Sequence, residues 1–410
     1  MVIGVHSGKY IAERETSRIR EATLRYDIGH PVLNDRQFRV WRSYAIRAWP
    51  SLVVIDRNGY VVGSHAGEFT AEMLDPALHE LLSTASVTRE IARLHFPAES
   101  PGIEPSVLRY PGKVTVDGER IAISDTGNHR VIIGRLKTVA RMQVEHVVTA
   151  IEQTGGVSSV RLDLVAPQGL AFDGANLYVA DSGTHTVSAI ETENAKTRLL
   201  AGIGAQMRSR ADQVAGALSS PWDVTVIDRT IFVAMAGVHQ IWAIDSVSGA
   251  TKVHSGTGAE DILDGPNASA LLAQPMGIAA LGDRLYFADA ESSAIRWADV
   301  DRDGNVGTIV GTGLFDFGDV DGIGDAVRIQ HPQGLAIHPT GDLIVADSYN
   351  DSLKLVNPST RSAKTWLRGF HEPAGIAAGK DSAYIADTNA HRIMVADYTT
   401  SELSELTIIS

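Results

Sequence analysis

The chain contains no cysteine among its 410 residues. Disulfides, thiolate metal ligands and thiol nucleophiles all require that side chain, so the chain as given has none of them. It also has no apolar run of about 18 residues, the length that a membrane-spanning helix needs. The segment from Met1 to Lys9 lacks the apolar stretch of a secretory signal. These absences predict a cytoplasmic protein without thiol chemistry.

Basic residues are outnumbered: 36 Lys and Arg stand against 49 Asp and Glu, which gives a formal net charge of −13. Contacts with phosphate groups need clustered Lys and Arg, and the sequence has no such stripe. This balance argues against general binding to nucleic acid or to anionic membranes. Apolar residues make up 44% of the chain, enough to build sizeable cores. We therefore expect an ordinary globular protein.

One motif is repeated six times between Pro111 and Ile393. Its clearest copy begins at Pro167 as Pro-Gln-Gly-Leu-Ala-Phe and continues from Leu177 as Leu-Tyr-Val-Ala-Asp-Ser-Gly-Thr-His-Thr-Val. Each copy has a Pro, a short apolar strand that mostly ends in Asp, and a polar residue four positions later. The Pro residues are Pro111, Pro167, Pro221, Pro275, Pro332 and Pro373. The strands end at Asp125, Asp181, Met235, Asp289, Asp347 and Asp387, and the polar residues are His129, His185, His239, Ser293, Asp351 and His391.

A period of about 40 to 58 residues built from short strands is typical of a β-propeller, in which each repeat forms one blade. We expect four strands per blade, for example 169–172, 177–181, 186–190 and 198–201, with the first nearest the central channel. Longer connections such as 263–270 and 319–326 join the blades and lie on a propeller face, where binding surfaces usually form. The sequence thus predicts a mainly β protein with a six-bladed propeller over 108–410.

Residues 1–85 alternate strands with helices. Strands are predicted over 2–6, 31–35, 51–56 and 60–63, and helices around 19–26, 36–46 and 74–81. This alternation predicts an α/β unit with a mostly parallel sheet, to which the turn at Asn58-Gly59 adds an antiparallel pair. Residues 86–107 are rich in Pro and polar residues, so we expect a linker there.

The repeat resembles the NHL repeat, and Asn128-His129-Arg130-Val131 is the nearest match to its Asn-His-Leu core. The resemblance covers about 300 residues. The first 85 residues resemble the later part of a thioredoxin-like domain, with Trp49-Pro50 at the position of the cis-proline that faces the active site of that fold. The order of the two parts resembles NHL-repeat proteins with an N-terminal thioredoxin-like domain, and this implies thiol–disulfide oxidoreductase activity for intact relatives.

The chain departs from that family at its start. There a strand and a helix with a cysteine motif precede the segment that resembles 2–7, whereas this chain begins after them. We therefore expect an incomplete thioredoxin-like domain whose missing central strand leaves neighbouring strand edges unpaired and apolar surface exposed. A rival interpretation is a complete glutaredoxin-like unit with Ser7-Gly-Lys-Tyr10 at the thiol positions. Neither interpretation supplies a redox nucleophile.

Several polar patterns suggest sites but are better explained as structure. The repeated His could form a metal ring, yet equivalent positions spread around the ring, so we expect contacts between blades. The strand-end Asp should accept backbone N–H groups of the following turn, and Met235 should weaken that turn and make its blade the most irregular.

The calcium-like stretch 299–305 lacks the acidic residue at position 12 and predicts a hairpin turn. Another acidic loop is expected to be solvated: it contains Asp316, Asp319, Asp321 and Asp325.

The sequence predicts a binding scaffold for a protein or a small molecule, without nucleic acid, membrane or cofactor. Candidate binding residues are Trp49 and Pro50 in the thioredoxin-like groove, and Lys113, Asp223 and His331 in the propeller channel. The alternative is a metal-dependent propeller enzyme of the lactonase or peptidyl-hydroxyglycine lyase type, because the resemblance extends to such propellers. Those enzymes use several His and carboxylate ligands, whereas the inner strands here offer only Lys113 and Asp223 as charged groups. We assign no catalytic residue and no metal ligand.

Overall fold

The computed structural model describes residues 1–67, 69, 71–83, 106–153 and 160–409. The chain divides into two compact units, Met1–Gly102 and Ile103–Ser410. The predicted linker over 86–107 lies outside the described residues except for its last two positions, so it stays a prediction. Among the described residues no helix is long and apolar enough to cross a membrane.

The N-terminal unit contains every strand and helix that the sequence predicts for it. Its elements are β1 (Gly4–His6), η1 (Ala12–Arg14), α1 (Thr16–Arg25), β2 (Val32–Asn34), α2 (Arg39–Ser43), β3 (Ser51–Ile55), β4 (Val61–Ala66) and α3 (Ala71–Ser83). Strand β1 pairs with β2 in parallel, and β3 pairs with β4 in an antiparallel hairpin through the Asn58-Gly59 turn.

These four strands form two separate two-stranded sheets, so the single sheet that we expected is not seen in the described residues. Within that part of the chain, β1 and β3 each pair along one edge only. Val5 on β1 and Ile55 on β3 expose 42% and 47% of their surface. Unpaired edges with exposed apolar residues are what the sequence predicts for this unit.

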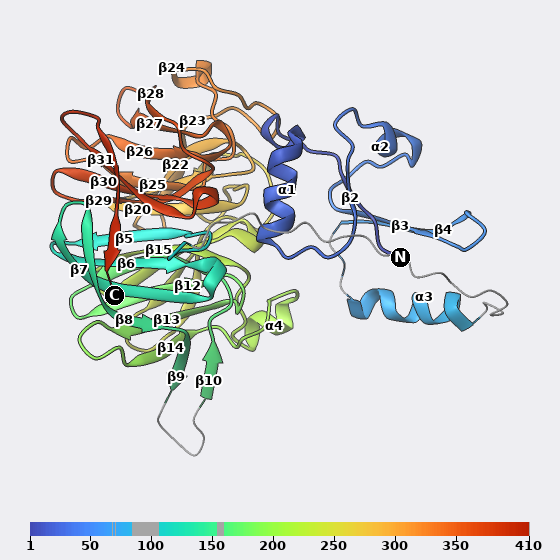
Figure 1. Ribbon diagram of the computed structural model, residues 1–410, viewed down its shortest axis with the longest axis horizontal. Helices are drawn as coiled ribbons and strands as arrows, with labels where there is room; N and C mark the ends of the chain where they lie inside the picture. The colour runs from blue at the N-terminus through green and yellow to red at the C-terminus, as the bar shows by residue number, and fades with distance from the viewer. Residues whose placement is uncertain (68, 70, 84–105, 154–159, 410) are drawn as a thin grey trace. The chain divides into compact units, whose positions relative to one another are not determined.

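The second unit is a six-bladed β-propeller (Figure 1). Its inner strands β5, β11, β15, β20, β25 and β29 contact one another in that order, and β29 contacts β5. Blades 1 and 2 comprise β5 (Lys113–Asp117), β6 (Arg120–Asp125), β7 (Arg130–Thr138), β8 (Arg141–Val148), and β11 (Pro167–Asp173), β12 (Asn176–Asp181), β13 (Thr186–Glu191), β14 (Thr197–Ala201). Blades 3 and 4 comprise β15 (Pro221–Ile227), β16 (Thr230–Met235), β17 (Gln240–Asp245), β18 (Thr251–Ser255), and β20 (Pro275–Leu281), β21 (Arg284–Asp289), β22 (Ala294–Asp299), β23 (Asn305–Val310). Blades 5 and 6 comprise β25 (Gly334–Ile337), β26 (Leu343–Asp347), β27 (Ser352–Asn357), β28 (Ser362–Arg368), and β29 (Pro373–Ala378), β30 (Ser382–Asp387), β31 (Arg392–Asp397), β32 (Leu403–Glu405).

The four predicted strands of the clearest repeat are confirmed as β11 to β14. The C-terminus completes the ring in a way that the sequence does not predict. The last repeat supplies its own outer strand through β32, which pairs with β31. The next strand, β33 (Thr407–Ile409), crosses to blade 1 and pairs in parallel with β8. One parallel strand therefore joins the last blade to the first.

Three further additions to the blades were also not predicted. A hairpin of β9 (Ala150–Gln153) and β10 (Val160–Asp163) lies between blades 1 and 2. The short strands β19 (Gly265–Pro266) and β24 (Gly322–Ile323) pair with the outer strands of blades 4 and 5. These two blades therefore have five strands each.

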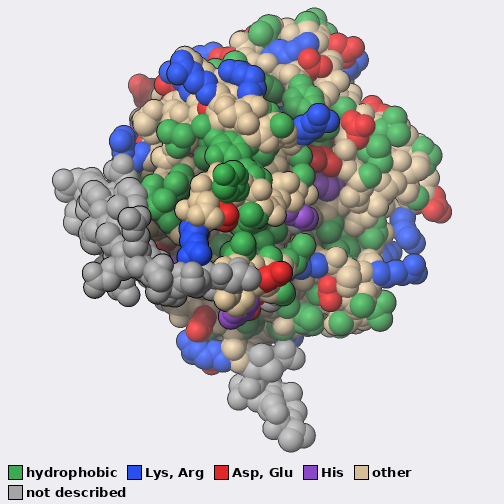
Figure 2. All heavy atoms as spheres, turned by 90° about the vertical axis from the view of Figure 1, so that its right-hand side faces the viewer, with side chains coloured by type: hydrophobic (Ala, Val, Ile, Leu, Met, Phe, Trp, Pro, Cys, Tyr) green, Lys and Arg blue, Asp and Glu red, His purple; other side chains and the backbone are tan. Residues whose placement is uncertain are grey.

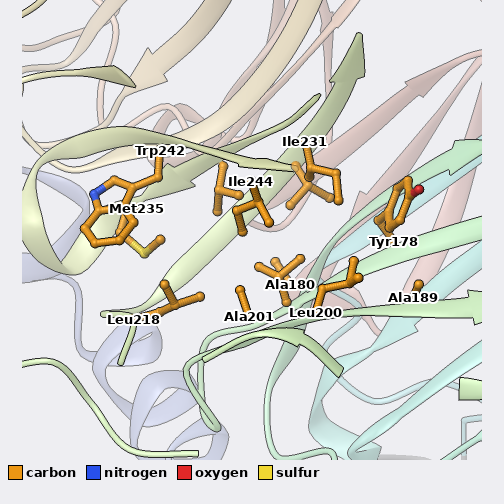
Figure 3. Close-up of a cluster of buried hydrophobic side chains, with 13 residues drawn as sticks. Tyr178, Ala180, Ala189, Leu200, Ala201, Leu218, Ile231, Met235, Trp242 and Ile244 are labelled. Atoms are coloured by element: carbon orange, nitrogen blue, oxygen red, sulfur yellow. The ribbon is translucent and has the colours of Figure 1, made fainter. Parts of the chain in front are cut away.

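Apolar side chains from neighbouring blades fill the space between them. The cluster between blades 2 and 3 includes Leu218, Met235 and Trp242, all at least 98% buried. Figure 3 shows Met235 beside the Trp242 ring. Blade 3 has four strands, and its turn over 236–238 has the same 3-10 conformation as the turns at 126–128, 348–350 and 388–390 in blades 1, 5 and 6. The prediction of an irregular blade 3 is wrong, because packing of Met235 replaces the contacts of the missing Asp.

Because the strands of each blade are antiparallel, the turns and loops that connect them lie at two opposite ends of the propeller. Turns between first and second strands and between third and fourth strands lie at one end. Turns between second and third strands and the loops between blades lie at the other, which we call the loop end. The longest described loops at the loop end are 202–220, 256–274 and 311–331. They expose aliphatic side chains: Ile203, Val214, Leu263, Val320 and Ile323.

Candidate functional site

The Asp at the end of each second strand holds the start of its own blade. Its carboxylate accepts the backbone N–H of the residue two positions before the blade's Pro. The five N–O distances lie between 2.6 and 2.9 Å, with donors Arg109, Val165, Ala273, Gln330 and His371 for acceptors Asp125, Asp181, Asp289, Asp347 and Asp387. Asp181 also accepts N–H groups of the following turn, from Gly183 and Thr184. The prediction that these Asp accept backbone N–H groups is therefore confirmed. However, the donor found in all five blades lies before the Pro, and not in the following turn that the sequence predicts.

The repeated His position joins each blade to the next. All six residues have left-handed backbone, with φ between 48° and 58°. In five of them the side chain accepts the N–H of the residue before the next Pro, at 2.9 to 3.3 Å: His185 from Ser220, His239 from Gln274, Ser293 from His331, Asp351 from Glu372 and His391 from Tyr110. The exception is His129, whose Nδ1 donates to the carbonyl of Val165 instead. The predicted role between blades is confirmed.

This role makes one contact between blades sensitive to pH. His185 Nδ1 accepts an N–H and therefore carries no proton, and burial lowers the pKa of His185 below its ordinary value of 6.5, although Asp181 opposes the shift. The unfolded chain thus takes up the proton first as the pH falls through about 6.5, and the folded state loses stability there. We expect the melting temperature to fall between about pH 7 and pH 5.5, and to fall less in His185→Asn.

The Asn variant is a matched control, since Asn tolerates left-handed backbone and keeps an acceptor oxygen without titrating. His185→Ala should cost about 1 kcal/mol at pH 7.5 from loss of the hydrogen bond. Thermal unfolding of the three proteins across this pH range measures both effects. Equal pH dependence of the wild type and His185→Asn would contradict the assignment.

Neighbouring inner strands approach each other closely at the third residue of each repeat, which we call the narrow level. That position holds Lys113, Gly169, Asp223, Gly277, Gly334 and Gly375. A Cβ atom added at Gly169 would lie 2.4 Å from the Cα of Asp223, and one added at Gly277 would lie 2.6 Å from the Cα of Gly334. Only glycine lets the inner strands approach so closely. The inner strands therefore pack backbone against backbone at this level.

Lys113 and Asp223 occupy the remaining two places and contact each other. Nζ of Lys113 lies 2.6 Å from Oδ2 of Asp223, and the two residues expose only 8% and 3% of their surface. The same Oδ2 accepts the N–H of Ile278 at 3.1 Å, so the group connects blades 1, 3 and 4. Burial raises the pKa of Asp223, while Lys113 and backbone N–H groups oppose that rise. A ligand at this level would have to replace the ion pair, and ligand binding by either residue stays a prediction.

His331, the third predicted channel residue, lies at the junction of blades 4 and 5. It is 7% exposed, its Nε2 lies 3.4 Å from Glu291 Oε1, and its ring stacks on Tyr349 with centroids 4.5 Å apart. Its backbone N–H makes the bond to Ser293 described above. These contacts account for its burial, and its ligand-binding role also stays a prediction.

In the N-terminal unit, the Trp49-Pro50 peptide bond is cis. Trp49 is 46% exposed; its Nε1 donates to the carbonyl of Ser7 at 2.8 Å, and its ring centroid lies 4.4 Å from that of Trp41. Asp35 accepts bonds from Ser7 Oγ and from three backbone N–H groups at the start of α2. These hydrogen bonds outweigh the effect of burial and hold the pKa of Asp35 below its ordinary value. The exposed ring of Trp49 thus lies directly before β3 and packs on the partly buried ring of Trp41 from α2.

Two buried cations that sequence reasoning missed hold the loops at blades 4 and 5. Arg296 is fully buried and lies 2.8 Å from Asp289 and 3.0 Å from Asp264. Lys354, also fully buried, lies 2.7 Å from Asp319 and 2.8 Å from Asp321. We call residues 256–274 and 311–331 the anchored loops. The sequence did contain a pattern that could have predicted these ion pairs. Each loop has an Asp-Gly pair, and the third strand of each of these two blades has a basic residue at its third position.

The acidic loop is therefore largely neutralised by the protein itself. Besides the two carboxylates bound to Lys354, Asp325 pairs with Arg361 and Asp316 accepts the Thr312 hydroxyl. Burial raises the pKa of Asp347, next to this group, to about 7, opposed by hydrogen bonds from Asn350 and Gln330. Where the structure describes the chain, no group of three or more His, Asp or Glu is placed to hold a metal ion.

The calcium-like stretch forms the predicted hairpin turn between β22 and β23. The N–H of Asn305 donates to Asp299 Oδ2 at 2.9 Å, and the N–H of Gly304 donates to the carbonyl of Asp301 at 3.0 Å. On the face shown in Figure 2, Lys and Arg side chains are interspersed with acidic ones rather than gathered in a stripe.

These features define a class: a mainly β protein built on a six-bladed β-propeller with NHL-type repeats. No family model matches the chain. It is 34% identical over 478 residues to NHL repeat-containing protein 2 of Gallus gallus, and the match covers all of this chain and 63% of that protein. It is 34% identical over 443 residues to Protein SUPPRESSOR OF QUENCHING 1, chloroplastic, of Arabidopsis thaliana, covering 99% of this chain and 42% of that protein. The chain thus spans less than two thirds of either relative.

A solved structure, an auxiliary nutrient binding protein from Bacteroides thetaiotaomicron, superposes with a TM-score of 0.51 at 12% identity. The superposition covers 73% of this chain and 70% of that one. At this identity the similarity concerns the fold alone.

Proposed function

We propose that this chain is a binding scaffold of the NHL repeat-containing type, which engages a partner through the loops at the loop end of its propeller. The proposal is supported by one contrast: the charged residues of the inner strands, Lys113 and Asp223, are buried and paired with each other, whereas three long loops at the loop end expose aliphatic side chains. The exposed loops therefore offer the better surface for a partner. Exposed apolar groups on ordered loops are typical of interaction sites.

The N-terminal unit is proposed to have a thioredoxin-like fold without thiol chemistry. The order of its strands and helices, the parallel β1–β2 pair and the cis Trp49-Pro50 bond support this proposal. The exposed ring of Trp49 beside that bond offers an apolar surface for an extended partner segment. Since the chain contains no cysteine, such a surface would bind without exchanging disulfides.

The metal-dependent enzyme is not proposed. A propeller enzyme of that kind needs several His or carboxylate ligands that converge in the channel. Here four glycines and one Lys–Asp pair occupy the narrow level. The four repeated His that could have supplied ligands hydrogen-bond to neighbouring blades instead.

Affinity capture from a lysate of the source organism tests the scaffold proposal. The wild-type chain is compared with the triple variant Val214→Ser/Leu263→Ser/Ile323→Ser, whose three changes all lie at the loop end. We expect the triple variant to lose captured proteins, quantified by mass spectrometry, because it removes exposed apolar contact area without touching a core.

The matched control is Val139→Ser/Val247→Ser/Leu281→Ser, with three exposed aliphatic residues in turns at the opposite end. It should capture the same proteins as the wild type. Equal losses in both triple variants, or no loss in the loop-end variant, would count against a partner site at the loop end.

A further inference from the structure

The two anchored loops are built to one plan. In each, an Asp side chain accepts both the backbone N–H and the hydroxyl of a Thr on the outer strand: Asp264 from Thr308, and Asp321 from Thr365. In each, the same Asp also binds the buried cation of the third strand. Each loop then adds a two-residue strand to its blade, β19 or β24.

Each loop packs apolar residues into a core between blades, Ala270 and Leu272 in one loop and Val327 and Ile329 in the other, and each also covers a buried cation. Removing a charged side chain from water carries a penalty that a carboxylate partner repays only with good geometry and further hydrogen bonds, and both cations are fully buried. The guanidinium of Arg296 also donates to the backbone carbonyls of Leu271 and Leu263. The result is a pair of loops with a fixed shape, and a preorganised surface loses less entropy when it binds.

The fixed loops expose aliphatic residues on two adjacent blades. Leu263 is 52% exposed, and its counterparts Val320 and Ile323 on the next loop are 49% and 67% exposed. Leu263 forms an antiparallel β-bridge with Leu271, and Val320 forms the same kind of bridge with Arg328. Leu263 and Val320 therefore occupy equivalent positions in their loops. Exposed aliphatic groups therefore recur on adjacent blades.

The charged residues of 256–274 are acidic, whereas most Asp residues of 311–331 are paired with Lys354, Arg361 or Arg368. Residues 256–274 contain Glu260, Asp261 and Asp264 but no Lys or Arg, and residues 311–331 contain four Asp and one Arg. The guanidinium of that residue, Arg328, donates to the backbone carbonyls of Asp325 and Val327. The carboxylates of Glu260 and Asp261 are exposed and take no part in the ion pairs of the described loops.

We propose that the anchored loops bind a partner segment that presents aliphatic side chains flanked by Lys or Arg. The inference rests on the proposed scaffold function and names the chemistry of its partner. Aliphatic groups of the segment would contact Leu263, Val320 and Ile323, while its cations would lie beside Glu260 and Asp261. Complementary charge speeds the encounter and excludes acidic segments, and apolar contact supplies the affinity.

Two synthetic peptides of about twelve residues test this chemistry, one of Leu and Lys and one of Leu and Glu with the same spacing. Each carries a fluorescent label and is titrated with the full chain while anisotropy is recorded. We expect the Lys peptide to bind, the Glu peptide not to bind, and binding to weaken as salt rises from about 0.05 to 0.5 M.

Two variants of the loops separate the apolar from the charged contribution. Both Leu263→Ser/Ile323→Ser and Glu260→Gln/Asp261→Asn should weaken binding of the Lys peptide about tenfold, since each loses about 1.4 kcal/mol of contacts. The control Val247→Ser/Leu281→Ser changes the opposite end and should bind like the wild type. All of these residues are exposed, so circular dichroism and melting should match the wild type.

Equal binding of the two peptides, or equal binding of the Lys peptide to all variants, would overturn the proposed chemistry. The scaffold proposal is judged separately, because capture from lysate that depends on the loop end would stand even if neither peptide bound. Loss of the Lys peptide from the control variant as well would show that the peptide adheres to exposed apolar residues in general, and would also overturn the proposal.

Discussion

Lys113→Met is expected to lower the free energy of unfolding of the propeller by about 3 to 5 kcal/mol. The substitution leaves the carboxylate of Asp223 buried, 3% exposed, without the ammonium that lies 2.6 Å from it. In a protein interior an unpaired charge costs far more than the mutual attraction of the pair contributes. Urea denaturation followed by fluorescence and by far-UV circular dichroism measures the change, provided that both signals give one transition.

A double variant shows whether charge or packing causes this loss. Lys113→Met/Asp223→Asn has no buried charge, and its Asn keeps an oxygen that can accept the N–H of Ile278. We expect it to recover at least half of the stability that Lys113→Met loses, because replacing a buried pair by neutral groups is often close to neutral. If the double variant were as unstable as the single one, lost packing around Lys113 rather than the unpaired carboxylate would explain the result.

The sequence predicted the propeller well because its information is local and repeated. Every copy of the motif contains its own strand pattern and its own turn residues, so the period alone indicates blades. The role of the repeated His could also be inferred, since six equivalent positions on a ring cannot meet at one ion. Ring closure through β33 could not be predicted from the sequence, because three residues near the C-terminus do not specify whether they pair with blade 6 or blade 1.

The candidate site was harder to predict, since its contacts join residues far apart in the sequence. Lys113 and Asp223 were chosen as the charged residues of the inner strands, and their role in binding stays a prediction. No pattern shows that two such residues 110 positions apart contact each other. Met235 shows the opposite case. Its replacement of Asp looked like a defect, but a large apolar side chain fills the interface between blades 2 and 3 (Figure 3).

Gly334→Ala should destabilise the propeller by about 3 kcal/mol, although it adds a single methyl group. A Cβ atom at this position would lie 2.2 Å from the carbonyl oxygen of Ala374 and 3.0 Å from its carbonyl carbon. These are backbone atoms of the neighbouring inner strand, which cannot rotate away as the end of a side chain can. The strand would have to move, and with it the contact between blades 5 and 6.

Gly322→Ala is the matched control within the same blade. Its added Cβ would lie 3.5 Å from the Cβ of Ala326, an ordinary van der Waals distance, and we expect a change below about 1 kcal/mol. Chemical denaturation of both variants measures the difference. If Gly334→Ala were as stable as Gly322→Ala, the inner strands would not be packed backbone to backbone. The glycines at the third position of the repeat would then need an explanation other than close approach of the inner strands.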